Sequence, residues 1–450
     1  MPNPYLPSWA YIPDGEPRVF GDRVYIFGSH DNAGNSEFCD WKLLCWSAPL
    51  SNLNAWVCHG DIFHTLPDRD HPSDTNWTND SMRLFAPDVV QGKDGKYYLF
   101  AYIVNSRGCV AVADRPEGPY KLLGQYEYDI PNEVCSYGAF VDPGVLVDDD
   151  GRTYIYCGYQ HSFMAEVNSD KMYEIIPGSY IEHIIPCKEE TEHGFDTHDK
   201  LFFEACSPRK VGDTYYLIYS PLKCPCLAYA TSKSPTGPFE YRGVIVDSGN
   251  DYPGGNNHGS IMKVGDQWYI FYHRMTNNSI MSRRGCVEKI EILPDGTIPQ
   301  VETTSLGFSE YLNPFEVTKA DLACVLKGTG FITEKNVFTR VVTNITETTV
   351  LGYKYFEFGT DDSSKTMEFA AKVNGMGMNC HLHILVDGED GEEIGCVDIG
   401  HDGGVVKGIV KAVTGRHSVF FKITTDYTGW TKGYFDNRCL FELEEFVFLK

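Results

Sequence analysis

A hydrophobic pattern recurs five times in the first part of the chain. Each copy has a turn, then an apolar segment rich in aromatic side chains, then a more polar segment. The turn glycine and the tyrosine that follows it align as Gly21 and Tyr25, Gly95 and Tyr98, Gly151 and Tyr154, Gly212 and Tyr216, and Gly265 and Tyr269. The tyrosines are 73, 56, 62 and 53 residues apart, which leaves room for about four short strands per copy. The repeat therefore predicts a five-bladed β-propeller.

An ionisable side chain stands at the same place in four of the five copies. A short apolar segment precedes each turn and forms a hairpin with the segment after it, and the first strand of such a hairpin is the innermost of a blade. Eleven or twelve residues before the aligned tyrosines lie Asp14, Asp142, Glu204 and His258, whereas the second copy has Ala86-Pro87 followed by Asp88. Turn composition favours aspartate, but it does not explain equal offsets. We expect these side chains to converge on one face of the central channel.

The repeat ends near residue 307, and a second domain follows. Residues 308–315 have the composition of a connection, and residues 316–450 contain alternating strand-like segments separated by Gly and Asp turns. The clearest are 367–373, 382–386, 417–423 and 441–448. The expected architecture is all-β, with a propeller over residues 1–307, a linker over 308–315 and a β-sandwich over 316–450.

Composition and charge narrow the classes of partner. The 450 residues carry a formal charge of −24, which repels phosphate backbones and anionic membrane surfaces. Nucleic acid and membrane are therefore not expected as partners, and the oligomeric state is left open. Aromatic residues make up 14% of the chain and glycines number 43, as is typical of many short strands joined by turns.

The N-terminal sequence and the cysteines bear on the compartment. The segment that starts at Met1 lacks the basic start and apolar run of a secretory signal, and no stretch of about 18 apolar residues occurs. The 15 cysteines are scattered singly, without the pairing of a disulfide framework. We expect a cytoplasmic protein whose thiols act as small apolar side chains.

Three carboxyls around one channel suit glycosidic bond cleavage with inversion. That reaction needs a protonated carboxyl to donate to the leaving oxygen and a carboxylate to activate water on the opposite face of the sugar. A third acidic group nearby keeps the pKa of the donor high by like-charge repulsion. Asp14, Asp142 and Glu204 supply the three groups.

Four motifs together resemble glycoside hydrolase family 43 over roughly residues 1–307. They are Ile12-Pro13-Asp14, Phe140-Val141-Asp142-Pro143-Gly144-Val145 with the turn at 148–151, Phe202-Phe203-Glu204-Ala205, and Asn257-His258-Gly259-Ser260. The second domain resembles a family 6 carbohydrate-binding module, mainly through residues 415–421 and 440–442.

The resemblance implies a role for five residues. Asp14 is expected as the general base, Glu204 as the general acid, and Asp142 as the group that tunes and orients the acid. His258 would lie on the axis and help to hold a Ca²⁺ ion through its hydration shell. Arg283 is similar to the arginine that approaches the sugar from the last blade in that family.

The resemblance also implies the substrate class. The leading hypothesis is an exo-acting, inverting hydrolase that removes α-L-arabinofuranosyl groups from arabinoxylan or arabinan oligosaccharides, with a β-xylosidase as the alternative. A non-catalytic sugar-binding propeller is the alternative from another class, although a binder of neutral sugars has no need to bury like charges. Trp9, Trp77 and Phe85 are candidates to line the sugar site, because aromatic faces pack on sugars, but each could equally be core.

Three other motifs have plainer interpretations. The turn at 148–151 lacks the acids that an EF-hand requires, since Leu146 and Cys157 stand at those places, so a hairpin turn is expected. The polar stretch 193–199 has two histidines but no standard zinc spacing. Cys224-Pro225-Cys226 has one intervening residue, which differs from the redox motif.

Overall fold

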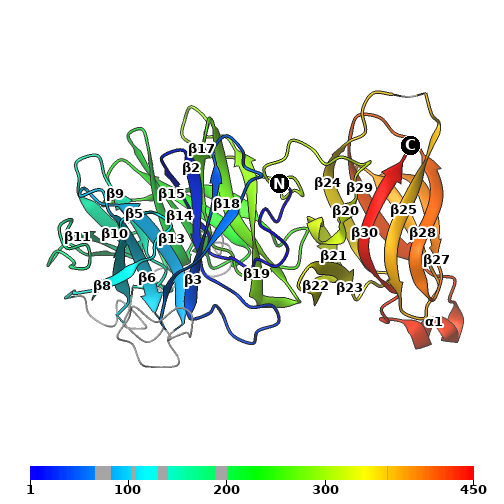
Figure 1. Cartoon of the computed structure of the whole chain (residues 1–450), viewed down its shortest axis with the longest axis horizontal. Helices are drawn as coiled ribbons and strands as arrows, with labels where there is room; N and C mark the ends of the chain where they lie inside the picture. Colours follow the sequence, from blue (N-terminus) through cyan, green and yellow to red (C-terminus); the bar gives the residue numbers. More distant parts are fainter. Residues whose placement is uncertain (66–82, 104–106, 130–139, 188–199, 362) are drawn as a thin grey trace.

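The computed structural model describes residues 1–65, 83–103, 107–129, 140–187, 200–361 and 363–450 (Figure 1). Their regular secondary structure is almost entirely β-strand and forms two domains. Five small antiparallel sheets form the N-terminal domain, and two larger sheets form the C-terminal one. The predicted all-β class, a propeller followed by a sandwich, is confirmed. Within the described residues, no helix is long and apolar enough to cross a membrane.

Each of the five small sheets is one blade, built as a meander from the axis outward. The first two blades contain β1 (Glu16–Phe20), β2 (Arg23–Gly28), β3 (Lys42–Pro49), β4 (Val57–His64), β5 (Leu84–Gln91), β6 (Tyr97–Ile103), β7 (Cys109–Ala113) and β8 (Lys121–Gln125).

The remaining three blades follow the same plan, with three strands in the last one among the described residues. They contain β9 (Gly144–Val147), β10 (Thr153–Cys157), β11 (Phe163–Val167), β12 (Ile181–Glu182), β13 (Phe202–Val211), β14 (Thr214–Pro221), β15 (Cys226–Ser232), β16 (Glu240–Asp247), β17 (Ser260–Val264), β18 (Gln267–Thr276) and β19 (Ser279–Ile290).

The blades close into a ring. The innermost strands β1, β5, β9, β13 and β17 contact one another in this order, and β17 contacts β1. The N-terminal segment locks the closure, because the side chain of Asn3 donates to the Val287 carbonyl at 2.8 Å and accepts from the Val287 amide at 2.9 Å. A side-chain amide thus pairs with β19 as a neighbouring strand would.

The hydrophobic cores lie between adjacent blades rather than within one. One cluster, for example, joins Phe27 and Leu43 of the first blade to Leu99 and Ala111 of the second. The five aligned tyrosines are all buried, with at most 8% of their surface exposed. The repeated aromatic positions therefore fill the space between the twisted sheets.

A segment without strands, residues 291–317, leads to the sandwich but is packed along its length. Phe308 contacts the rings of Tyr5 and Tyr269 in the propeller, at centroid distances of 5.6 and 5.2 Å. Phe315 packs against the core of the sandwich. The connection is thus longer than the eight residues predicted and is part of the packed structure.

The sandwich has sheets of six and five strands around one core that contains residues of both. In the order of the chain its elements are β20 (Thr318–Lys319), the short 3₁₀ helix η3 (Ala320–Leu322), β21 (Val325–Lys327), β22 (Phe331–Asn336), β23 (Thr339–Thr343), β24 (Val350–Glu357), β25 (Thr366–Gly375), β26 (Cys380–Val386), β27 (Glu392–Ile399), β28 (Gly403–Lys411), β29 (Arg416–Thr424), α1 (Gly429–Phe435) and β30 (Phe441–Leu449).

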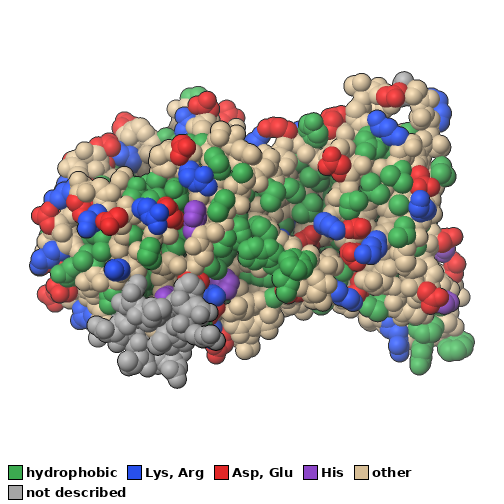
Figure 2. Space-filling model, in the orientation of Figure 1, with side chains coloured by type: hydrophobic (Ala, Val, Ile, Leu, Met, Phe, Trp, Pro, Cys, Tyr) green, Lys and Arg blue, Asp and Glu red, His purple; other side chains and the backbone are tan. Residues whose placement is uncertain are grey.

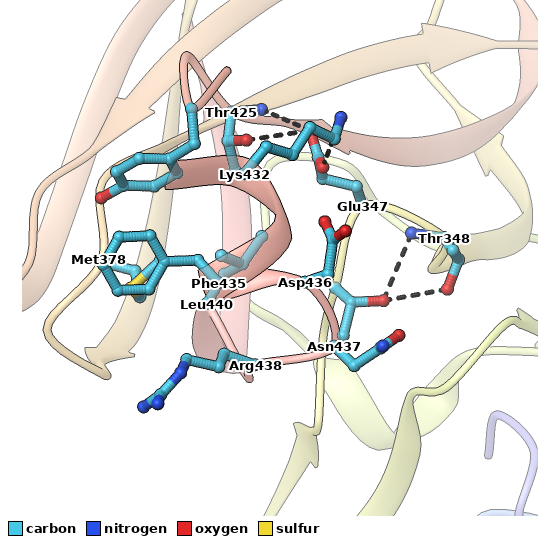
Figure 3. Close-up of a pocket in the computed structure, with 12 residues that line it drawn as sticks. Glu347, Thr348, Met378, Thr425, Lys432, Phe435, Asp436, Asn437, Arg438 and Leu440 are labelled. Atoms are coloured by element: carbon cyan, nitrogen blue, oxygen red, sulfur yellow. Dashed lines mark hydrogen bonds and ion pairs between the residues drawn. The ribbon is translucent and has the colours of Figure 1, made fainter. Parts of the chain in front are cut away.

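Helix α1 lies at one end of the sandwich. Trp430 and Tyr434 on this helix are 85% and 64% exposed, and Figure 2 shows the apolar side chains at this end of the molecule. A cavity of about 310 Å³ lies beside α1 (Figure 3). On its wall, Lys432 pairs with Glu347 at 3.0 Å.

The two domains share an interface with buried charges. Arg284 of β19, 2% exposed, pairs with Asp321 of η3 at 2.7 Å. Arg274 donates to the Ala323 carbonyl at 3.1 Å, and the Asn277 amide donates to the Ile332 carbonyl at 2.7 Å. The last blade is therefore completed by contacts with the second domain.

Candidate active site

A cavity of about 320 Å³ opens where the innermost strands begin, within the size range of small-ligand sites. The described residues that line it are Asp14, Phe38, Phe85, Tyr102, Val141, Asp142, Tyr159, Glu204, Asn256, His258 and Arg283. The four ionisable positions predicted from the repeat thus lie around one cavity, although they are up to 244 residues apart.

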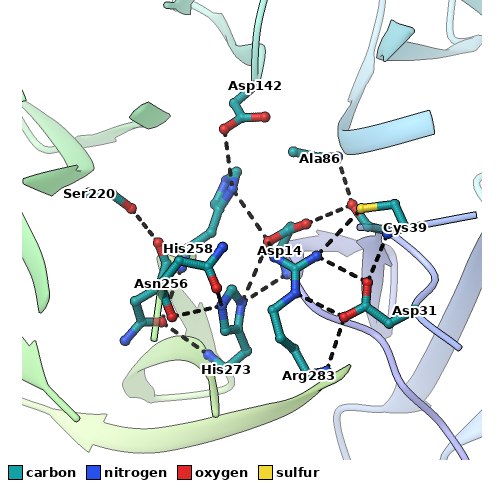
Figure 4. A network of polar contacts seen from close by, with 12 residues as sticks. Asp14, Asp31, Cys39, Ala86, Asp142, Ser220, Asn256, His258, His273 and Arg283 are labelled. Carbon is teal, nitrogen blue, oxygen red and sulfur yellow. Dashed lines mark hydrogen bonds and ion pairs between the residues drawn. The ribbon is translucent and has the colours of Figure 1, made fainter. Parts of the chain in front are cut away.

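Asp14 is held by contacts on both carboxylate oxygens. Ser29 donates to Oδ2 at 2.7 Å, and Nη1 of Arg283 donates to Oδ1 at 2.9 Å (Figure 4). The backbone amide of Asp14 donates to Nδ1 of His273 at 3.3 Å. Burial alone would raise the pKa of Asp14, but Arg283 above all, then His258, outweigh it and hold this pKa below the usual value. Asp14 is therefore a carboxylate at neutral pH.

Arg283 is fixed by a second aspartate. Asp31 accepts from Nε and Nη2 of Arg283 at 2.9 and 3.1 Å and from its backbone amide at 3.0 Å. The guanidinium also lies over the ring of Phe38, 5.0 Å from its centroid. Arg283 lines the cavity as predicted, and it also sets the charge and position of Asp14.

The second blade, which lacks an acid at the repeated position, supports Asp14 indirectly. The amide of Ala86 donates to Oγ of Ser29 at 2.8 Å, and Ser29 in turn donates to Asp14. The hydroxyl is thereby oriented toward the carboxylate.

His258 lies between Asp14 and Asp142. Its Nδ1 is 3.8 Å from Oδ1 of Asp14 and 3.9 Å from Oδ2 of Asp142. Burial raises the pKa of Asp142 to about 8, and the nearby Glu204 and Asp14 charges add to this effect. Asp142 therefore carries a proton at neutral pH.

Glu204 also binds its proton more tightly than an ordinary glutamate. Its side chain is partly exposed because it faces the cavity, yet the surrounding protein removes enough water to raise its pKa to about 7. The second cause of the raised Glu204 pKa, after burial, is the negative charge of Asp14. Asp142 is itself protonated over much of the same pH range. The cavity thus contains an ionised acid and a protonated acid, as acid–base catalysis requires.

The backbone at the repeated position is strained in three blades. Asp14, Ala86 and Asp142 have φ values of 55°, 31° and 50°, and Ala205, next to Glu204, has 67°. Such values cost non-glycine residues about 1–3 kcal/mol each and cluster at functional sites. Here they occur beside the cavity, close to where the inner strands of the first four blades begin.

Of the predicted aromatic residues, one lines the cavity. Phe85 does so beside Tyr102, at a centroid distance of 5.8 Å. Trp9 is not among the described lining residues: it is 45% exposed and packs on Trp46, 5.4 Å away, on the neighbouring core. Trp77 lies outside the described residues.

Four of the residues in or near the site that were not predicted from the sequence follow a second regular offset. Ser29, Tyr102, Ser220 and His273 each lie four residues after an aligned tyrosine. The hairpin register brings them to the inner position of their own blade, as in the pair Glu204 and Ser220. A search for polar and aromatic residues at this offset would have found them.

The plainer interpretations of two motifs agree with the structure. Asp148, in the turn at 148–151, accepts from Tyr215 at 2.6 Å and pairs with Lys210, and Cys224 and Cys226 are free thiols. The stretch 193–199 lies outside the described residues.

Comparison with known proteins identifies the family. The model of the glycosyl hydrolases family 43 matches residues 18–298. The chain belongs to this family. Family 43 members are glycoside hydrolases, and the chain is therefore an enzyme of this class.

One relative and two solved structures are similar to the chain. It is 42% identical over 364 residues to a xylosidase/arabinosidase of Thermoclostridium stercorarium, covering 75% of this chain and 73% of the relative. A family 43 β-xylosidase/α-arabinofuranosidase from a compost metagenome, solved with xylotriose in a calcium-free form, shares 28% identity and a TM-score of 0.53, over 67% of this chain and 98% of that one. The fold of the whole chain is similar to that of a Bacillus subtilis arabinoxylan arabinofuranohydrolase (TM-score 0.54, 23% identity, 100% and 97% coverage).

Beneath the family 43 site, a buried ionic cluster fills the axis. Arg18 pairs with Asp88, and Arg209 pairs with Glu16; all four are buried or nearly so. These side chains come from the inner strands of the first, second and fourth blades. Each acid lies two residues after the repeated position of its own blade: Glu16 follows Asp14, and Asp88 follows Ala86.

Main-chain and hydroxyl groups extend this axial cluster to the other blades. Arg18 donates to the Val145 carbonyl at 2.8 Å, and Arg209 donates to the Ile261 carbonyl at 3.0 Å. Ser207 donates to Glu16 at 2.9 Å and lies 2.6 Å from Ser260. All five blades therefore meet in one network below the carboxyls of the cavity.

Proposed function

We propose that the enzyme is an exo-acting, inverting glycosidase that removes α-L-arabinofuranosyl groups from arabinoxylan or arabinan oligosaccharides. The observation that carries this proposal is the pairing, in one cavity, of an Asp14 with a lowered pKa and a Glu204 with a raised pKa. The names of the relatives support the pentose preference.

In the proposed reaction, protonated Glu204 donates to the oxygen of the leaving group while Asp14 removes a proton from the attacking water. Arg283 and Ser29 hold the two oxygens of Asp14, and neutral His273, whose pKa is lowered to about 3 by burial, fixes its backbone. Asp14 thus remains ionised and aligned as the bond breaks. The aromatic walls contributed by Phe85 and Tyr102 suit the apolar face of a sugar ring.

β-Xylosidase activity is the second candidate, because the xylosidase/arabinosidase relative carries both activities in its name. Hydrolysis of 4-nitrophenyl α-L-arabinofuranoside and 4-nitrophenyl β-D-xyloside decides between them. We expect kcat/KM for the arabinofuranoside to be about tenfold higher or more, which corresponds to a transition-state difference of about 1.4 kcal/mol. The reverse order would assign the enzyme as a xylosidase, and hydrolysis of neither would contradict the proposal.

We also propose that a Ca²⁺ ion binds on the axis beside His258 as a hydrated ion. The described residues suit a hydrated ion with few direct protein ligands: His258 offers one nitrogen, and an Asp14 oxygen lies 3.8 Å from it. When bound, the ion would supply positive charge beside the carboxyls.

We propose that the sandwich, whose sequence resembles a family 6 carbohydrate-binding module, acts mainly as a structural partner of the propeller. The Arg284–Asp321 pair and the packing of Tyr252 into the sandwich core support this role. Exposed Trp430 is the candidate for a residual sugar platform.

A truncated chain tests that structural role. We expect residues 1–310 alone to be insoluble or to melt about 10 °C lower than the full chain, because Arg284 and Arg274 lose their partners and apolar interface becomes exposed. Differential scanning fluorimetry measures the shift. A fragment of equal stability and equal activity on short substrates, together with xylan binding by the isolated sandwich, would assign the domain to polymer binding instead.

A further inference from the structure

A cluster of nitrogen and sulfur ligands lies in the third blade, apart from the carboxyl cavity. One ligand atom each from His161, His183 and Cys187 lies within 4.8 Å of the others. Sγ of Cys187 is 3.6 Å from Nδ1 of His161 and 3.8 Å from Nδ1 of His183. None of the three residues lines the cavity described above.

The backbone builds this cluster from two neighbouring strands and a turn. Strand β11 pairs with β12 through Phe163 and Glu182, so His161 and His183 lie at the same end of this pair. The His183 amide donates to the Ser162 carbonyl at 2.6 Å. The hydroxyl of Ser162 accepts from the Ile185 amide at 2.9 Å and donates to the Ile185 carbonyl at 2.8 Å. These bonds turn the chain so that Cys187 faces both rings.

The two sulfur–nitrogen distances match those of a tetrahedral metal site. With Zn–S of about 2.3 Å and Zn–N of about 2.0–2.1 Å, sulfur and nitrogen ligands of one ion are about 3.6 Å apart. A cation placed between the two ring nitrogens would be bound by both of them and by an ionised thiol.

The surroundings also fit a bound metal. Oε2 of Glu182 lies 3.6 Å from Nε2 of His183, on the ring nitrogen that does not face the sulfur. A carboxylate near the second nitrogen of a histidine ligand orients the ring and increases its basicity. Cys187 is fully buried while His183 is exposed, so the sulfur is protected and the ion remains accessible from solvent.

We propose that His161, His183 and Cys187 bind a Zn²⁺ ion as three of its four ligands. A thiolate with two imidazoles selects a borderline-soft ion such as Zn²⁺ over Ca²⁺, which prefers oxygen. Binding displaces the thiol proton to solvent and involves no redox change.

The position of the site gives the ion a structural role. The Phe202 amide donates to the Pro186 carbonyl at 2.9 Å, and the Gln160 amide donates to the Phe203 carbonyl at 2.6 Å. Both contacts join the metal-binding segments to the start of β13, which carries Glu204. The ion clamps the third blade to the strand of the proposed acid.

Metal titration of the full chain tests the proposal. After chelation and buffer exchange, one equivalent of Co²⁺ is expected to bind and to give a thiolate-to-cobalt charge-transfer band in the near ultraviolet. Cys187→Ser loses the band, and Cys396→Ser, which removes an exposed thiol of the sandwich, retains it. An excess of Zn²⁺ is expected to raise the Tm of the wild type and of Cys396→Ser by about 5 °C, but not that of Cys187→Ser.

A second variant keeps the test decisive if Cys187→Ser misfolds. Because His183 is exposed, His183→Gln is expected to fold and to lose the Zn²⁺-dependent rise in Tm. The proposal is overturned if the wild type gives no charge-transfer band, or if Cys187→Ser and His183→Gln bind Co²⁺ and respond to Zn²⁺ as the wild type does.

Discussion

Glu204→Gln is expected to lose about 10²–10⁴-fold in kcat on an arabinoxylan oligosaccharide but less than about tenfold on a dinitrophenyl arabinofuranoside. The oligosaccharide leaves as an alkoxide unless it is protonated, whereas dinitrophenolate is stable without a proton. Asp14→Asn is expected to lose at least 10²-fold on both substrates, because both require activated water. Asp213→Asn, an exposed carboxyl of the same blade as Glu204, is the control and should match the wild type.

The pH profile gives this prediction a second measurement. Glu204 must be protonated to act as an acid, so kcat/KM of the wild type should fall as the pH rises through about 7. Asp14 must be ionised, and its lowered pKa places the acid limb below the range in which an ordinary aspartate titrates. Glu204→Gln should lose the alkaline limb. Equal losses by both variants on both substrates, with the limb retained in Glu204→Gln, would refute the separate roles.

Arg209→Met is expected to destabilise the propeller by about 3–5 kcal/mol, because it leaves Glu16 buried without its main partner. The change also removes hydrogen bonds to the carbonyls of Pro17 and Ile261, which join the fourth blade to the first and the fifth. Urea unfolding followed by tryptophan fluorescence measures the loss. Lys233→Met, which breaks an exposed pair with Asp213, should cost less than about 1 kcal/mol.

A double variant separates buried charge from lost packing. Glu16→Met combined with Arg209→Met leaves neither of the two charges, so it should be more stable than Arg209→Met alone. The opposite result is a stability loss of the double variant that equals the sum of the losses of Glu16→Met and Arg209→Met. That result would show that the two side chains do not act as a charged pair and that the pair does not hold the blades together.

The positions of the three cavity carboxyls could be predicted because they obey the repeat. Asp14, Asp142 and Glu204 start inner strands, and a propeller brings such starts to one axis whatever the length of the outer strands. The aligned tyrosines could be found for the same reason, since blade packing demands a large apolar side chain at one place in every copy.

Features that depend on single long-range contacts were not predictable. Asp31 and Arg283 are 252 residues apart, and nothing in either segment signals their pairing. Arg209 reaches the axis partly because β13 is irregular between Glu204 and Ser207, which shifts the inward-facing positions. Trp9 fits an aromatic-platform pattern but packs against Trp46, since composition alone does not tell a core ring from a cavity ring.

The separation of roles between the acids also depended on the structure. The sequence placed three like residues at equivalent positions, and only their surroundings distinguish them: Arg283 keeps Asp14 ionised, while burial keeps Glu204 and Asp142 protonated. Equivalent positions in a repeat thus acquire different chemistry from contacts outside the repeat.

The anomeric configuration of the first product tests the central claim most directly. Hydrolysis of an arabinofuranoside in D₂O, followed by proton NMR before mutarotation, reports it within the first minutes of reaction. With Asp14 as base and Glu204 as acid on opposite faces of the sugar, the account predicts the inverted β-arabinose as the first product. First release of α-arabinose, with configuration retained, would require a covalent intermediate on one of the carboxyls and would contradict the account.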